Sequence, residues 1–211
     1  MFIDNSTATE IATFGRLVYS EDYLLQNVTL GIRKRNTKDN IVKRSFLDVD
    51  VYMKVNHILP NHGKVTVKLS CEFVDSVGIP EEILWNCAYR NMENKFSITP
   101  LPVLFNLDYG IPTLHVITTK NGYDGACALL YKEEFAKHCR NINVSYIYII
   151  PSSTEELLLV ADNDEIFYKP SELAKLVQEI NSSIVDEKIQ LSPTIYRFCE
   201  DTESISIAAR T

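Results

Sequence analysis

Two serines in the stretch IYIIPSSTEELLLV are the first residues of this sequence whose types could support chemistry. Ser152 and Ser153 lie between two apolar runs, and Glu156 follows them. A serine hydroxyl is a weak nucleophile until a neighbouring base, usually histidine, removes its proton. The 4 histidines belong to no recognisable catalytic motif, and the Gly-x-Ser-x-Gly pattern is absent. The stretch therefore favours a hairpin turn whose hydroxyls bind its own backbone, and a catalytic role requires the fold to bring His115 or His138 to Ser152.

A pair of carboxylates is the second candidate site. Asp48 and Asp50 stand two residues apart in FLDVDV. On a strand such residues share a face, about 6.5–7 Å apart, which could hold a divalent cation or place an acid beside a base. The neighbouring strand carries Lys68 and other polar residues, so that pairing of Asp50 with a lysine across the strands is the simpler interpretation.

No cofactor or metal is expected from the remaining motifs. There is no Cys-x-x-Cys and no His-Glu-x-x-His, and His138 and Cys139 are neighbours that diverge on a helix. The glycines in GYDG are too few for a phosphate-binding loop. The 5 cysteines are scattered and odd in number, which is typical of reduced thiols.

The charge distribution argues against nucleic acid as a direct ligand. The formal net charge is −7, whereas affinity for nucleic acid comes mainly from basic residues that neutralise phosphates. Basic residues gather between Arg33 and Arg44, while the last third of the chain is acidic. This separation of charge would suit docking on a charged protein. Solvated surface is the simpler interpretation of both segments. The role of the basic stretch stays open.

The start of the chain lacks the features of a secretory signal, and no apolar run approaches the ~18 residues that would span a bilayer. We therefore expect a cytoplasmic protein that does not bind membranes.

Helices are predicted at four places. Thr7-x-x-Glu10 has the form of a capping box and predicts a helix over 8–19. Pro80 with two following acids predicts a second, whose buried stripe is Ile83, Leu84, Cys87, Ala88 and in part Asn91. A short helix is expected over 133–140, and one more begins near Pro170, with a stripe at Leu173, Leu176, Val177 and Ile180.

Alternating apolar residues predict strands between these helices. We expect them at 28–32, 47–55, 65–73, 113–119, 125–131, 146–150, 157–160 and within 194–208. Turns are expected at Pro60–Gly63 and around Lys120-Asn121-Gly122, each closing a hairpin. The fold class is therefore α+β, largely an antiparallel sheet of hairpins with helices packed on one face. A single domain over residues 1–211 is expected, with 1–40 as the part that could be less integrated.

The order of several short segments resembles a bacterial family catalogued as a domain of unknown function, number fifty-six eighty-eight. The similarity runs from about Lys43 to Tyr196, roughly three quarters of the chain. The matching segments are RSFLDV from Arg44, IPEEIL from Ile79 with Ala88 and Asn91, Gly125-Ala126 with Leu129-Leu130-Tyr131, IPSS from Ile150 with Glu156, and LSPTIY from Leu191.

Two positions depart from the pattern of that family. The family has histidine just before the glutamate of its Pro-Ser-Ser turn, where this chain has Glu155, and threonine where this chain has Met92. The first departure removes the base that would stand beside Ser152. What the resemblance implies is a bacterial or bacteriophage cytoplasmic protein of α+β architecture with no established substrate.

The hypothesis favoured by the sequence is a non-enzymatic acidic binding module. It would regulate or inhibit a macromolecular partner, most simply a protein, and could be carried by a phage or mobile element, for example against a host defence. The alternative is a hydrolase that uses Ser152 or the pair Asp48 and Asp50. A third hypothesis is an assembly factor that acts as a homodimer through an edge strand.

Overall fold

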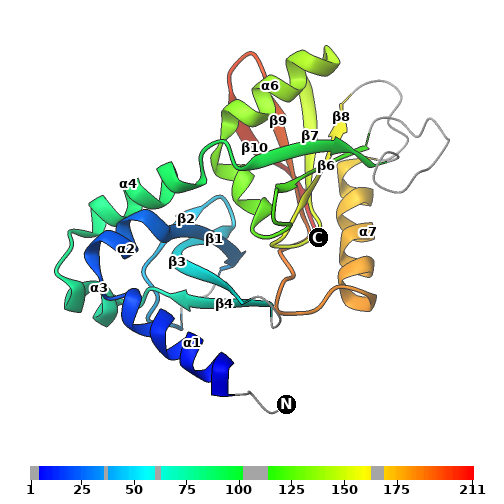
Figure 1. Cartoon of the computed structure of the whole chain (residues 1–211). Coiled ribbons are helices and arrows are strands. Elements are labelled where there is room, and N and C mark those ends of the chain that lie inside the picture. The colour runs from blue at the N-terminus through cyan, green and yellow to red at the C-terminus, as the bar shows by residue number, and fades with distance from the viewer. Residues whose placement is uncertain (1–4, 36–37, 60–62, 102–113, 163–168) are drawn as a thin grey trace. The chain divides into compact units, whose positions relative to one another are not determined.

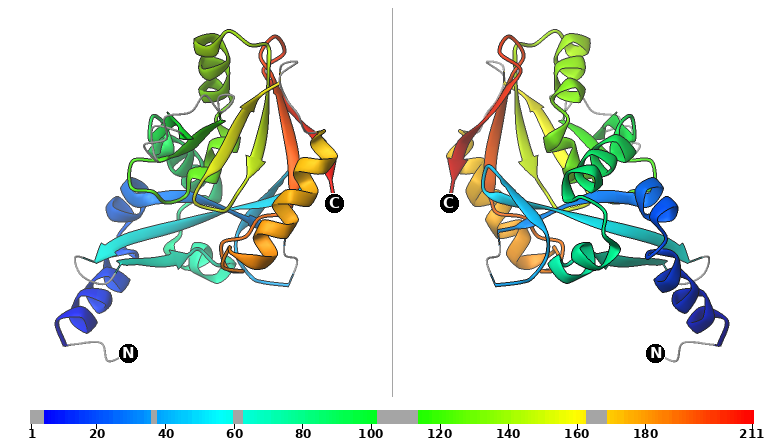
Figure 2. Two further views of the ribbon diagram at one scale, coloured as in Figure 1. Left: turned by 90° about the vertical axis from the view of Figure 1, so that its right-hand side faces the viewer. Right: turned by 90° about the vertical axis from the view of Figure 1, so that its left-hand side faces the viewer.

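The computed structural model describes residues 5–35, 38–59, 63–101, 114–162 and 169–211 of the chain (Figure 1, and from two other sides in Figure 2). The strands form one sheet of four strands and one of six. The predicted α+β class with antiparallel sheets is confirmed.

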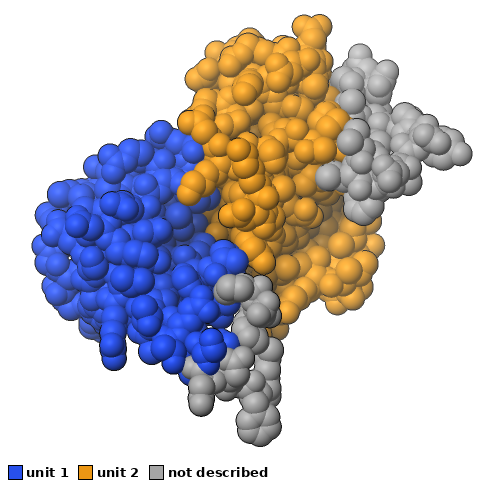
Figure 3. All heavy atoms as spheres, in the orientation of Figure 1, with its two compact units in different colours: residues 1–31, 36–44, 51–93 blue, residues 32–35, 45–50, 94–211 orange. Residues whose placement is uncertain are grey.

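The chain divides into two compact units, coloured separately in Figure 3. The first consists of residues 1–31, 36–44 and 51–93, and the second of residues 32–35, 45–50 and 94–211. The chain passes between the units inside three strands, β1 (Val28–Lys34), β2 (Lys43–Phe46) and β3 (Val49–Leu59). The single domain over 1–211, with a less integrated segment 1–40, stays a prediction.

The elements before residue 93 build the four-stranded sheet and its helices. In the sheet the order is β1-β3-β2, and β4 also pairs with β3. The remaining elements are α1 (Asn5–Leu17), α2 (Glu21–Asn27), β2 (Lys43–Phe46), β4 (Gly63–Lys68), α3 (Cys71–Val77) and α4 (Glu81–Met92).

The predicted hairpin of β3 and β4 is present, but its second strand is shorter than expected. The two strands pair from Lys54 with Lys68 to Leu59 with Gly63, and the turn residues 60–62 lie outside the described residues. The prediction of a strand reaching residue 73 is wrong. The Ser70 hydroxyl accepts a hydrogen bond from the amide of Phe73 at 3.1 Å, so that Ser70 caps α3 and the residues after it are helical.

Both faces of β3 are buried over residues 49–55. Every residue from Val49 to Val55 is buried, including the polar ones at alternate positions. The ring of Tyr52 lies near the ammonium groups of Lys54 and Lys68, at 5.9 and 5.2 Å from the ring centroid. The alternation of apolar residues therefore predicts the strand but not the burial of its polar positions.

The first helix begins earlier than predicted. It starts at Asn5, which places Thr7 inside the helix and buries it, so Thr7 is not the N-cap. The ring of Phe14 stacks on His57 of β3 with centroids 5.0 Å apart, and Glu10 Oε1 lies 3.1 Å from His57 Nε2. These contacts fasten α1 to β3.

The second predicted helix is α4, with one error in its buried stripe. Trp85 is fully buried, whereas Ile83, which we placed in the stripe, is 45% exposed. The Trp85 indole donates to Glu81 at 2.8 Å, and the guanidinium of Arg44 lies 4.5 Å from the ring centroid. Asn91, expected on the inner side, donates to the carbonyls of residues 25 and 28, each at 2.9 Å.

The six-stranded sheet has the order β10-β9-β7-β8-β6-β5, with every ladder antiparallel. Its strands are β5 (Phe96–Pro100), β6 (Leu114–Thr119), β7 (Tyr146–Pro151), β8 (Leu157–Ala161), β9 (Thr194–Cys199) and β10 (Ser204–Arg210). The predicted hairpin of β7 with β8 and the predicted strands at the end of the chain are confirmed.

The hairpin predicted after β6 is wrong. The Asn-Gly turn forms, with Gly122 at a φ of 71°, but residues Gly125–Leu130 form the 3-10 helix η1, and β6 pairs with β5 and β8 instead. A Cβ on Gly125 would clash with the carbonyl oxygen of Glu155 and lie 2.7 Å from Thr118 Cα. The glycine is needed because two backbone segments meet there.

Helices cover both faces of this sheet, where we expected one. On one face, Phe135 of α6 (Lys132–Ile142) packs against Phe198, with ring centroids 5.7 Å apart. On the other face, α7 (Pro170–Ser183) buries Leu173, Ala174 and Val177 against Ile150 and Ile195. Figure 2 shows α7 lying along the sheet beside β10.

In the part of the chain that the structure describes, no helix is both long and apolar enough to cross a membrane.

Candidate functional site

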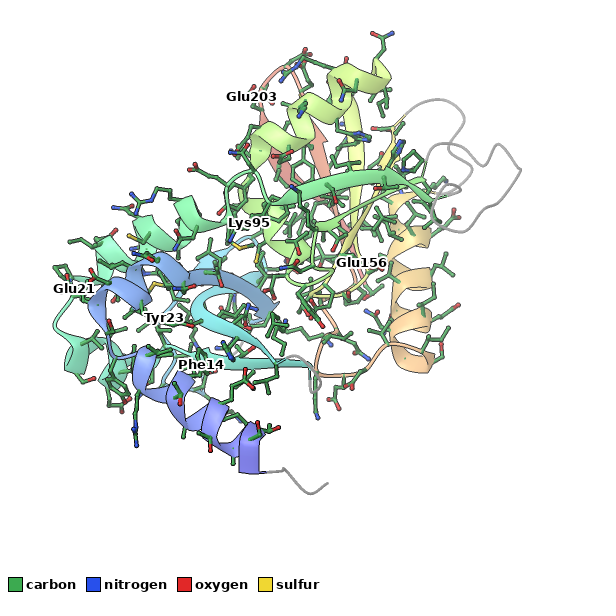
Figure 4. All side chains as sticks on the ribbon, in the orientation of Figure 1. Phe14, Glu21, Tyr23, Lys95, Glu156 and Glu203 are labelled. Carbon is green, nitrogen blue, oxygen red and sulfur yellow. The ribbon has the colours of Figure 1, made fainter. Side chains whose placement is uncertain are left out.

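The turn between β7 and β8 uses its hydroxyls internally. Pro151 and Leu157 form the last pair of the ladder, so residues 152–156 make the turn, where Figure 4 labels Glu156. The Ser152 hydroxyl donates to the carbonyl of Glu156 at 3.1 Å and lies 3.2 Å from its Oε1. Ser153 is buried and its Oγ accepts a hydrogen bond from the amide of Glu155 at 3.1 Å. Both serines therefore hold the turn in shape.

Glu155 ties this turn to the start of η1. Its Oε2 accepts a hydrogen bond from the amide of Asp124 at 2.8 Å. Its carbonyl accepts from the Thr118 hydroxyl at 2.8 Å and from the Gly125 amide at 3.0 Å. The residue that stands where the resembled family has histidine is thus an anchor for three backbone segments.

His115 does not serve Ser152 as a base. In the ladder of β6 with β8, His115 lies opposite Leu159, while the Ser152 hydroxyl is bonded to Glu156. The ring of His115 packs edge to face on His138 of α6, with centroids 4.5 Å apart. The fold therefore brings the two histidines to each other.

Asp48 lies in the tight turn before β3, after Leu47 at a φ of 50°. Its carboxylate accepts hydrogen bonds from the hydroxyls of Thr194 and Tyr196, both at 2.6 Å. Burial and then the hydrogen bond to Asp48 raise the pKa of Tyr196 above its ordinary value. This arrangement joins the 47–48 turn to β9 and keeps Tyr196 protonated as a donor.

Asp50 lies on β3 and is only 2% exposed. Its Oδ2 is 3.9 Å from Nη2 of Arg33 on β1. Lys68 lies opposite Lys54 in the ladder of β3 with β4. The pairing of Asp50 with a lysine stays a prediction. Among the described residues, no group of three or more His, Cys, Asp and Glu side chains could hold a metal ion.

A pocket of about 370 Å³ opens between α6, β5 and β6. We call it the α6 pocket. Four apolar residues line it, Phe96, Ile98, Pro100 and Ile142. Six polar residues complete its wall, Ser97, His115, Glu134, Lys137, His138 and Asn141.

The two histidines of the α6 pocket are both buried, at 7% exposure for His115 and 5% for His138. Burial, and then the charge of His115, lower the pKa of His138 to about 4. At neutral pH its ring is therefore uncharged and offers one N–H donor and one nitrogen acceptor.

Reasoning from the sequence missed this pocket, although a signal was present. Glu134, His138 and Asn141 follow one another at intervals of four and three residues, which puts them on one side of a helix. His115 could not be placed beside them without knowing that β6 runs under α6.

The fold and these sites define an α+β protein with two antiparallel sheets, an internally bonded Pro-Ser-Ser turn and a polar pocket on one face of the larger sheet. Residues 33–200 match the model of a family of unknown function, DUF5688, and the chain belongs to this family. The predicted family is thereby confirmed. No curated protein and no solved structure matches the chain.

Segments that carried the resemblance are bonded to one another. RSFLDV meets LSPTIY through Asp48, Thr194 and Tyr196. The Pro-Ser-Ser turn meets Gly125 through the carbonyl of Glu155. The similar segments thus stabilise the second unit.

Proposed function

We propose that this protein is a cytoplasmic, non-enzymatic module that regulates or inhibits a partner protein, which docks on the outer side of α7. The setting that the sequence suggested, a bacterium, phage or mobile element with an anti-defence role as one example, belongs to the same proposal. The main support for this proposal is the exposed apolar surface of α7.

The observation that supports a docking partner is a second apolar face on α7. Leu173, Ala174 and Val177 are buried against the sheet. Leu176, Ile180 and Ile184 are exposed at 45%, 41% and 80%. We call these three residues the α7 stripe. Leu176 and Ile180 are four residues apart on one side of α7, and Ile184 is the C-cap residue that follows the helix. Large exposed apolar side chains close together are typical of protein contact sites.

The charges beside the α7 stripe indicate the kind of partner. Exposed acids flank it at Glu172, Glu179, Asp186 and Glu187, and exposed bases at Lys175 and Lys188. The surplus of acids matches a protein that presents an apolar patch with a basic rim. A second copy of this chain fits less well, because two such faces would bring acids together in a protein whose net charge is −7.

Within the described part of the chain, the candidate residues of a hydrolase are bonded to other groups of the protein. The Ser152 hydroxyl binds the turn, Asp48 accepts two hydroxyl donors, and Asp50 lies beside Arg33. Groups held in this way would have to leave their partners before they could act on a substrate.

The test is affinity capture from the host with three tagged proteins. They are the natural chain, the variant Leu176→Ser/Ile180→Ser/Ile184→Ser, and a control, Ile83→Ser, which removes an equally exposed isoleucine from α4. We expect a basic protein that is retained by the natural chain and the control, lost by the stripe variant, and released as salt is raised.

Two results would contradict the proposal. One is a captured protein whose retention does not depend on the α7 stripe. The other is a homodimer in sedimentation velocity that the stripe variant abolishes, which would make a second copy the occupant.

A further inference from the structure

The α6 pocket has the size and lining of a small-molecule site. Ligand pockets range from about 300 to 1,000 Å³, and this one lies at the small end, which favours a ligand of few atoms. Phe96, Ile98 and Ile142 offer an apolar wall, and the polar residues are concentrated on α6. The lining therefore suits an amphipathic molecule.

His138 gives the pocket a directional polar contact. Among the described residues its ring contacts His115, and no hydrogen bond to its nitrogens is formed. Because His138 lines the pocket, a ligand bound there can supply that hydrogen bond. Its low pKa means that it meets that ligand as a neutral group.

The lining of the α6 pocket carries one negative and one positive side chain. Glu134 and Lys137 stand three residues apart on α6. Within residues 114–162 and the other described ranges, neither takes part in an ion pair or a side-chain hydrogen bond. A ligand with a single charge would be attracted by one and repelled by the other, whereas a ligand carrying both charges satisfies both.

We propose that the α6 pocket binds a small zwitterion of the amino-acid type with an apolar side chain. The ammonium group pairs with Glu134, the carboxylate pairs with Lys137 and accepts a hydrogen bond from His138, and the side chain lies against Phe96 and Ile98. This site is separate from the α7 stripe and does not depend on the proposed partner.

The experiment follows the imidazole signals of His138 by NMR during titration with L-leucine. Isocaproate, which lacks the ammonium group, and isoamylamine, which lacks the carboxylate, serve as matched probes. Glu134→Gln and Lys137→Met remove the two charges one at a time. Glu133→Gln and Lys132→Met are the controls, because both residues are exposed on the same helix and lie outside the pocket lining.

We expect L-leucine to shift the His138 signals with saturation, and each singly charged probe to bind at least about tenfold more weakly. Glu134→Gln should weaken leucine but not isocaproate, and Lys137→Met should weaken leucine but not isoamylamine. The control variants should leave leucine binding unchanged, and melting temperatures verify that all four variants fold. The proposal is wrong if neither L-leucine nor L-phenylalanine shifts His138, or if isocaproate binds as tightly as leucine.

Discussion

At the scale of single residues, the polar groups that look reactive in the sequence form hydrogen bonds that hold backbone segments together. Glu155 joins the turn after β7 to Asp124, Thr118 and Gly125. Asp48 fastens a second turn to β9 in the same manner. The backbone carbonyl of Glu155 accepts the bonds from Thr118 and Gly125, and its carboxylate accepts the bond from Asp124. A hydrogen bond to a charged group contributes about 1.5–3 kcal/mol.

Replacing Gly125 by alanine tests the junction around Glu155. The added methyl group would meet two backbone segments, so the Gly125→Ala variant should lose about 1–3 kcal/mol of unfolding free energy. Gly15→Ala is the control, because nothing lies within 4 Å of a Cβ there and alanine favours the helix by about 0.5–1 kcal/mol. Urea denaturation measures both, and equal effects of the two substitutions would show that the junction is not tight.

The buried histidine pair predicts an acid-dependent loss of stability. The pKa of His138 falls from 6.5 to about 4 on folding, so between these values the unfolded chain binds more protons than the folded protein. The neutral ring therefore contributes stability above pH 6.5 that is lost as the pH falls toward 4.

Comparison with the His138→Gln variant isolates this contribution from the other groups that titrate, including His115 on β6 and Glu134 on α6. Between pH 6.5 and 4 the natural chain should lose about 1.4 kcal/mol more per pH unit than the variant. Parallel pH profiles from chemical denaturation would disprove the assignment.

Residue types alone could mark Ser152, Asp48 and Asp50 as candidates, but not their partners. The serines' role in a turn followed from local chemistry, since the atoms that bind them lie within four residues. The partners of Asp48 lie almost 150 residues away in the chain, and Arg33, which lies beside Asp50, belongs to a different strand. Long-range contacts of this kind depend on the topology and leave no local trace.

At the scale of elements, the sequence predicted most helices and strands and failed where two signals overlap. The alternation that runs through 65–73 continues past Ser70, yet the serine caps a helix and ends the strand. The apolar run 125–131 has the composition of a strand, but the close approach of Glu155 and Thr118 at Gly125 leads the chain into η1. In both places one polar or small residue outweighs the apolar pattern.

The two faces of α7 should respond differently to substitution. Leu173→Ala, on the inner face, should cost about 2–5 kcal/mol of unfolding free energy, because it leaves a cavity against the sheet. Leu176→Ser together with Ile180→Ser, on the α7 stripe, should change it by no more than about 0.5 kcal/mol per site, because these side chains are 45% and 41% exposed. Thermal or urea unfolding compares them, and a large loss for the stripe variant would mean that the stripe is needed for folding.

At the scale of the whole molecule, the chain forms two compact units that share three strands. β1, β2 and β3 each contribute residues to both, so that neither unit consists of a continuous stretch of sequence. Separate unfolding of one unit would require breaking these strands in the middle. We therefore predict that the units unfold together, as the single domain expected from the sequence would.

Two probes can follow the units independently. The chain has a single tryptophan, Trp85, whose fluorescence reports on the first unit. The NMR signals of His138 report on the second unit. In urea the two transitions should have the same midpoint. Midpoints that differ would show two domains and contradict the prediction.

The central claim is that a protein partner binds the α7 stripe, and the dissociation constant of the captured partner tests it most directly. Isothermal titration calorimetry should give at least tenfold weaker binding for Leu176→Ser/Ile180→Ser than for the natural chain, a change of about 1.4 kcal/mol or more. Ile83→Ser should bind like the natural chain. Equal dissociation constants for this double variant and the natural chain would contradict the claim.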